Sequence, residues 1–158
     1  MQFLFMSLFV VAITLLDQWT KWLTVANIPM FGKVDVIDGL FHFTYVRNFG
    51  AAFSSLEGMR WLFVAIFLVL TVAIVYEYFK SPLPFSKFER WCIAAIYGGG
   101  LGNVIDRVRF GYVVDMIEVE FMEFAVFNVA DCFITCGCIV MMISLVFFNK
   151  RFWKEEKK

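Results

Sequence analysis

Four long apolar segments dominate this chain and limit the folds that it can adopt. They cover residues 3–26, 61–79, 90–106 and 128–148. A helix needs about 20 apolar residues, within a range of about 17–25, to cross the hydrocarbon core of a bilayer. The chain is only 18% charged, whereas a soluble domain is about 25% charged. The sequence therefore predicts an all-α membrane protein with four transmembrane helices, folded as one integral-membrane domain over residues 1–158.

The Lys and Arg residues of the predicted loops indicate the orientation, because cytoplasmic loops are enriched in them. One side, formed by the loop at 80–89 with its flank and by the C-terminal tail, has eight: Lys80, Lys87, Arg90, Lys150, Arg151, Lys154, Lys157 and Lys158. The longer loops at 27–60 and 107–127 have five: Lys33, Arg47, Arg60, Arg107 and Arg109. We therefore expect a retained first span, both termini in the cytoplasm and the longer loops on the extracytoplasmic side.

These longer loops contain patterns of regular structure. Residues 34–37 and 41–46 are rich in β-favouring side chains and flank a turn at Asp38-Gly39, and residues 113–121 form a further strand-like run. We expect a small extracytoplasmic β-sheet on the membrane surface. Residues 51–59 predict an amphipathic interfacial helix.

Acidic residues from separate parts of the chain gather at the predicted outer leaflet. Asp17 lies late in the first span, Asp106 ends the third, Asp115 follows in the outer loop and Asp131 opens the fourth. Charged groups at a membrane are costly and are by default candidates for function. A glycine cluster at residues 98–102 predicts close helix packing beside Asp106.

Asp115 and Asp131 are the pair that we select as catalytic. Two neighbouring carboxylates share one proton, so that one can activate water while the other polarises a peptide carbonyl. Spacing alone leaves another interpretation open, in which one of them caps the fourth span or pairs with Arg107. The supporting residues also have structural alternatives: an i,i+4 pair for Asp17 and Lys21, an N-cap for Asn128 and snorkelling for Arg107.

Other catalytic classes find little support in the sequence. It contains no G-x-S-x-G or H-E-x-x-H motif, and its one histidine, His42, lies in a loop without a partnering motif. The four cysteines at 92, 132, 136 and 138 fall in apolar segments, where we expect them to pack rather than bind metal. We expect no metal and no cofactor, and the zero formal net charge does not suggest a nucleic-acid partner.

Four motifs, in order along the chain, carry a resemblance to a known family. They are D-Q-W-T-K at 17–21, R-N-F-G-A-A-F at 47–53, G-G-G-L-G-N-V-I-D-R at 98–107 followed by G-Y-V-V-D at 111–115, and F-N-V-A-D at 127–131. Together they strongly resemble the lipoprotein signal peptidases (signal peptidase II), which are bacterial membrane aspartyl proteases. Departures are mild: Met116 stands where an aromatic residue is common, and the fourth span is unusually rich in cysteine.

The resemblance implies an endopeptidase of the bacterial cytoplasmic membrane that acts at the extracytoplasmic face. Its substrate would be the signal peptide of a lipid-modified prolipoprotein, cut before the diacylglyceryl-cysteine, with membrane lipids as neighbours and a monomer as the expected state. Asp115 and Asp131 match the catalytic aspartates. The positions that match residues organising the site or holding substrate are Asp17, Lys21, Asn48, Asn103, Asp106, Arg107 and Asn128.

Two non-proteolytic functions remain as alternatives. A small transporter or a proton- or ion-conducting subunit would use membrane acids as a relay, and such acids would be stacked through the bilayer. A non-catalytic assembly subunit would use the glycine-rich face.

Overall fold

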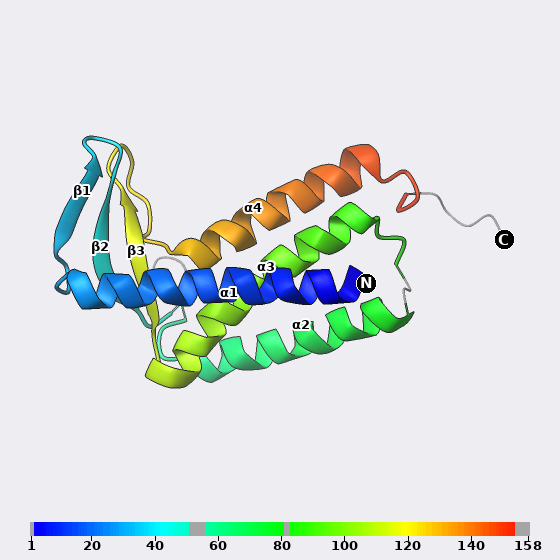
Figure 1. The fold of residues 1–158 in the computed structure, drawn as a ribbon, viewed down its shortest axis with the longest axis horizontal. Coiled ribbons are helices and arrows are strands. Elements are labelled where there is room, and N and C mark those ends of the chain that lie inside the picture. The colour runs from blue at the N-terminus through cyan, green and yellow to red at the C-terminus, as the bar shows by residue number, and fades with distance from the viewer. Residues whose placement is uncertain (1, 51–55, 81–82, 154–158) are drawn as a thin grey trace.

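The computed structural model describes residues 2–50, 56–80 and 83–153. Helices run side by side along the molecule, and a small sheet stands at one end of the bundle (Figure 1). In chain order the elements are α1 (Gln2–Asn27), β1 (Lys33–Ile37), β2 (Phe41–Asn48), α2 (Arg60–Lys80), α3 (Lys87–Phe110), β3 (Val113–Val119), α4 (Val129–Ile143) and a short π-helix, η2 (Ser144–Phe148), that continues α4. The predicted combination of four helices with a small sheet is confirmed.

Three helices in the described part of the chain are long and apolar enough to cross a membrane: α1, α2 and the continuous helix Val129–Phe148. Their surfaces expose large apolar side chains such as Leu8, Val69 and Met142. Helix α3 does not meet the same criterion, although it has 24 residues, because charged residues lie near both of its ends. The third predicted span, at residues 90–106, therefore stays a prediction, whereas the other three predicted spans coincide with these helices.

Helix α3 packs against the other helices through its glycine-rich face. A Cβ atom at Gly99 would lie 2.5 Å from the carbonyl oxygen of Ala130 in α4, and one at Gly98 would lie 3.1 Å from Cβ of Ile13 in α1. A Cβ atom at Gly102 would overlap the carboxylate of Asp17. These contacts bring α1 and α4 close to the same segment of α3, which is the close helix packing expected from the glycine cluster.

The sheet has the order β1-β2-β3, and both pairs are antiparallel. Buried Ile28, Tyr45, Val114 and Met116 form a small core beneath it. The two predicted strands of the first loop are present, whereas the predicted strand at 113–121 ends at Val119. It ends there because its partner strand β2 begins at Phe41, which pairs with Val119, and beyond this pair the N–H of Glu120 donates to the carbonyl of Leu40 in the turn, at 2.9 Å.

The predicted interfacial helix at 51–59 is only partly covered, since residues 51–55 lie outside the described residues. Residues 56–58 form a turn, and the N–H of Met59 donates to the carbonyl of Leu56 at 3.2 Å. For these residues the prediction of a helix is wrong. Helix α2 begins directly afterwards, at Arg60.

Candidate active site

Asp115 and Asp131 reach the same cavity from two different elements. Asp115 belongs to β3 and is 2% exposed, while Asp131 lies in the first turn of α4 and is half-buried. Both line a cavity of about 520 Å³, together with Asn48, Asn103 and Arg107. The structure thus brings together two aspartates that are 16 positions apart in the sequence.

Asn128 connects the two aspartates. Its side-chain amide donates to Oδ1 of Asp115 at 2.6 Å, and its side-chain oxygen accepts the backbone N–H of Asp131 at 3.0 Å. Its own backbone N–H donates to Oδ2 of Asp131 at 3.2 Å, which completes a reciprocal capping box at the start of α4. Asn128 and Asp131 therefore cap α4 and also belong to the cavity site.

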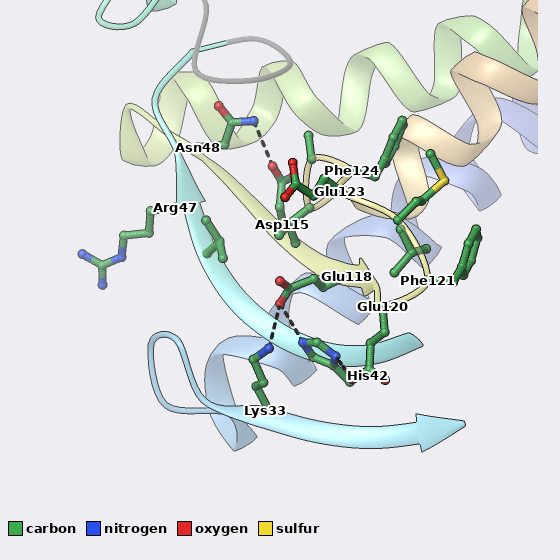
Figure 2. A pocket seen from close by; sticks show the side chains of 15 residues that line it. Lys33, His42, Arg47, Asn48, Asp115, Glu118, Glu120, Phe121, Glu123 and Phe124 are labelled. Carbon is green, nitrogen blue, oxygen red and sulfur yellow. Dashed lines mark hydrogen bonds and ion pairs between the residues drawn. The ribbon is translucent and has the colours of Figure 1, made fainter. Parts of the chain in front are cut away.

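Two further asparagines complete the hydrogen bonding of the carboxylates. The amide of Asn48, at the end of β2, donates to Oδ2 of Asp115 at 2.9 Å (Figure 2). The amide of Asn103, from α3, donates to Oδ1 of Asp131 at 2.8 Å. Each carboxylate oxygen of the pair accepts one hydrogen bond from an asparagine, so the positions of both acids are fixed from three sides.

A buried ion cluster lies behind these asparagines. Nζ of Lys21 lies 2.8 Å from Oδ2 of Asp17 and 3.2 Å from Oδ2 of Asp106, and it donates to Oδ1 of Asn103 at 2.9 Å. Asp17 also accepts the backbone N–H of Ala130 at 3.0 Å. The cluster joins α1, α3 and the start of α4, so the Asp17–Lys21 pair does more than stabilise its own helix.

Asp106 extends this cluster to the sheet. Its Oδ2 accepts the backbone N–H of Val114, the residue before Asp115, at 3.0 Å, and its Oδ1 accepts the side-chain amide of Gln18 at 2.8 Å. The D-Q-W-T-K motif contains Gln18, but sequence reasoning did not select it. An uncharged glutamine beside a predicted site aspartate gave no electrostatic signal.

Arg107 lies at the cavity without an ion pair to either aspartate among the described residues. Its guanidinium donates to the carbonyl of Gly50 at 2.8 Å and to that of Asn103 at 3.2 Å. The same group lies 4.5 Å from the centre of the Phe63 ring. The alternative in which an aspartate pairs directly with Arg107 is therefore not what the structure has.

The environment of Asp115 favours its protonated form. Burial is the main cause and raises the pKa of Asp115 to about 7, while the hydrogen bonds from Asn48 and Asn128 oppose this shift. The negative charge of Asp131 raises the pKa of Asp115 further. Asp131 sits at the N-terminus of α4, where the helix dipole stabilises an anion. The two carboxyl groups thus lie in different environments.

A larger cavity of about 880 Å³ lies against the sheet and shares Asn48 and Asp115 with the first (Figure 2). His42 on its wall is 1% exposed, and its ring nitrogens lie 2.6 Å from a carboxylate oxygen of Glu118 and 2.7 Å from one of Glu120. Sequence reasoning found no partner for His42 because its partners come from β3 and the residue after it. The only signal was that Glu118 and Glu120 alternate, which places them on one face of a strand.

One group of side chains in the described residues has metal-ligating atoms close together. These atoms, from Asp35, His42 and Glu120, all lie within 4.8 Å of one another. Because Glu118 and Glu120 already engage both ring nitrogens of His42, we assign no ion to this group.

Known proteins resemble this chain along most of its length. Residues 9–147 match the family model described as signal peptidase (SPase) II. A lipoprotein signal peptidase of Streptococcus thermophilus (strain CNRZ 1066) is 40% identical over 147 residues, which cover 93% of this chain and 91% of that protein. A lipoprotein signal peptidase of Caldanaerobacter subterraneus subsp. tengcongensis is 42% identical over 143 residues, which cover 90% and 97%.

A solved structure described as a bacterial membrane enzyme, determined by the in meso method, has a similar fold. It superposes with a TM-score of 0.85 at 32% identity, and the match covers 97% of this chain and 93% of that one. A second such structure gives a TM-score of 0.81, also at 32% identity, with 91% and 94% covered. The chain therefore belongs to the signal peptidase II family of bacterial membrane peptidases.

Proposed function

We propose that Asp115 and Asp131 are the catalytic pair of this aspartic-type peptidase and that they activate one water molecule between them. The substrate is the signal peptide of a lipid-modified prolipoprotein, cut before the diacylglyceryl-cysteine. The observation that carries this proposal is the cavity that both aspartates line, beside which buried Asn128 donates hydrogen bonds to both carboxyl groups, from its side-chain amide to Asp115 and from its backbone N–H to Asp131. The reaction needs water alone as co-reactant.

The different environments of the two acids suggest how the roles divide. Buried Asp115, with its pKa raised to about 7, carries the shared proton and donates a hydrogen bond to the scissile carbonyl oxygen. Asp131, at the N-terminus of α4, is ionised and takes a proton from water as the water attacks the carbonyl carbon. Protonation of the leaving amine then releases the two products.

The membrane placement that we propose has four spans, with the sheet on the extracytoplasmic side. Helix α3 has 24 residues, or about 36 Å at a rise of about 1.5 Å per residue, and it lies within the bundle formed by the three apolar helices (Figure 1). Basic Lys80 is the last residue of α2, Lys87 is the first of α3, and Lys150 and Arg151 follow η2. These ends of the helices lie away from the sheet (Figure 1). The enrichment of cytoplasmic loops in Lys and Arg supports this orientation.

This placement suits a substrate that is anchored in the bilayer. A lipid-modified prolipoprotein reaches the site by lateral diffusion, and the cavity wall offers it apolar Val113, Val126 and Phe127 next to the polar aspartates. A monomer is sufficient for this reaction, because all the proposed residues come from one chain.

The distribution of acids argues against a proton or ion relay. In α3, the buried acids Glu89 and Asp106 are 17 positions apart, or about 25 Å along the helix axis. Among the described residues, α1 contributes only Asp17, α2 only Glu77 and α4 only Asp131. The carboxylates of the described helices therefore form two separate groups, one with Asp17, Asp106 and Asp131 and one with Glu77 and Glu89, and not a continuous series through the bundle.

The direct test is cleavage by purified protein in lipid nanodiscs. The substrate is a synthetic prolipoprotein peptide with a diacylglyceryl-cysteine, the control is the same peptide without the lipid, and mass spectrometry locates the cut. We expect one cut before the modified cysteine, no cut in the unmodified peptide, and no inhibition by a chelator. Intact lipidated peptide after prolonged incubation, or a proton flux across vesicles containing the protein, would contradict the proposal.

A further inference from the structure

Two cysteines lie in the wall of the active-site cavity. The cavity that holds Asp115 and Asp131 is also lined by Cys132, Thr135 and Cys136 of α4. Cys132 and Cys136 are four residues apart, so their side chains point to the same side of the helix. Cys132 is half-buried and Cys136 is exposed. Both thiols thus lie on the stretch of α4 that leads away from the catalytic acids.

We propose that Cys132 and Cys136 form a modification site for small, uncharged, thiol-selective electrophiles, and that an adduct there blocks the substrate. The blocking effect rests on the proposed function, whereas the modification itself does not. The cavity measures about 520 Å³, so a ring attached to either sulfur occupies space that the peptide backbone needs beside Asp131. The substrate competes for the same space and protects both thiols.

The chemistry is a conjugate addition to an electron-poor alkene such as a maleimide. The thiolate sulfur forms a bond to one alkene carbon, the π electrons move to the adjacent carbonyl as an enolate, and the enolate takes a proton from water. Nothing leaves and no oxidant is needed. Because the thiolate is the reactive form, the reaction is followed in an alkaline buffer. An uncharged reagent also partitions into the bilayer beside α4.

The other two cysteines are internal controls. Cys92 in α3 is buried, which shields it from reagent. Cys138 is exposed on α4 but is not among the described residues that line this cavity. An adduct on Cys138 therefore reports general access from the bilayer without blocking the site.

The experiment treats the full-length protein in nanodiscs with N-ethylmaleimide, maps adducts by peptide mass spectrometry and measures cleavage of the lipidated peptide in parallel. We expect adducts on Cys132 and Cys136, none on Cys92, and loss of cleavage that follows the cavity adducts. Prior incubation with the lipidated peptide should slow labelling of the two cavity thiols and leave Cys138 unaffected. The doubly substituted Cys132→Ala/Cys136→Ala protein should keep its own untreated rate after exposure, whereas Cys138→Ala should remain sensitive.

Several results would overturn the site. They are unlabelled cavity thiols, full cleavage by protein that carries both adducts, or equal sensitivity of the doubly substituted protein. If untreated protein cleaves nothing, the proposed function fails, but labelling of Cys132 and Cys136 that the lipidated peptide suppresses still supports the site. If such an inactive protein is labelled equally with and without the lipidated peptide, the proposed modification site is contradicted.

Discussion

Asn128 donates its side-chain amide to Oδ1 of Asp115 across 2.6 Å, although the two residues belong to different elements. The same side chain caps α4 by accepting the backbone N–H of Asp131. A change in the position of Asn128 would therefore move both acids. The structural interpretation of Asn128 as an N-cap and the functional interpretation as a site residue are both supported by its contacts.

Replacement of Asn128 separates these two roles. Asn128→Ala removes an N-cap, which costs about 1 kcal/mol of stability, and it also removes the link between the aspartates. We expect a modest fall in melting temperature and a much larger loss of cleavage, measured well below that temperature.

Ser86→Ala is the matched control, because Ser86 caps α3 with the same kind of capping box. This variant should lose similar stability while it keeps its cleavage rate. Equal loss of activity in the two variants would mean that Asn128 acts only through helix stability.

The buried lysine provides a second test. Lys21 is 3% exposed and lies between the carboxylates of Asp17 and Asp106. Lys21→Met leaves two buried acids without a counter-charge, and breaking such a cluster costs about 3–5 kcal/mol. We expect a large fall in melting temperature in detergent.

Lys33→Met is the comparison for this test. Lys33 is exposed and lies 3.7 Å from Glu118, and a surface pair of this kind contributes about 0–1 kcal/mol. A melting temperature that is equally insensitive to both changes would show that the buried cluster contributes nothing to stability.

The close approach of α1 and α3 predicts a position-specific effect of added methyl groups. In Gly102→Ala the new Cβ atom overlaps the carboxylate of Asp17, so either the helices separate or Asp17 leaves Lys21. Overpacking of this kind costs about 1–3 kcal/mol, and we also expect cleavage to fall. In Gly100→Ala the new atom meets only the Phe67 ring, at 3.0 Å, and the ring can rotate. A more severe effect at position 100 than at position 102, by melting temperature, would contradict this packing.

The sequence allowed us to select polar residues that lie near one another in the fold, but it did not predict which of them form hydrogen bonds with each other. Long apolar segments predicted the helices and runs of β-favouring residues predicted the sheet. The nine selected polar residues either line one cavity or are joined to its lining residues by hydrogen bonds and ion pairs, directly or through Lys21. Burial of His42 between Glu118 and Glu120 was not predictable, since it depends on the register between β2 and β3. The same limit applies to Gln18, whose partner Asp106 is 88 positions away. Local patterns contain no information about such long-range pairings.

The pKa of Asp115 predicts how cleavage depends on pH. Because this pKa is raised to about 7, Asp115 loses its proton as the pH rises through neutrality, and the pair then lacks its acid. We expect kcat/KM to decline on the alkaline side with an apparent pKa of about 7, a value that belongs to the pair. A rate that stays constant from about pH 6 to about pH 9 would contradict a protonated Asp115.

The stability of the folded protein also depends on pH through Asp115, and the raised pKa of this group determines the direction of the dependence. The folded protein holds the Asp115 proton up to about pH 7, whereas the unfolded chain releases it near the ordinary value of 3.8. Between these values the folded state binds more protons, so its stability falls as the pH rises. Melting curves should show this decline in the wild-type protein and a weaker one in Asp115→Asn.

The most direct measurement is cleavage of the lipidated peptide by Asp115→Asn, Asp131→Asn and the doubly substituted protein. Two groups that act on one water are not additive, because loss of either one abolishes the same step. We expect each single change to lower the rate about 10²–10⁴-fold, the double change to lower it no further, and Asp38→Asn, in an exposed turn, to have no effect. A catalytic pair would be contradicted if either single variant kept its cleavage rate. It would also be contradicted if the fold-loss of rate in the double variant equalled the product of the two single fold-losses.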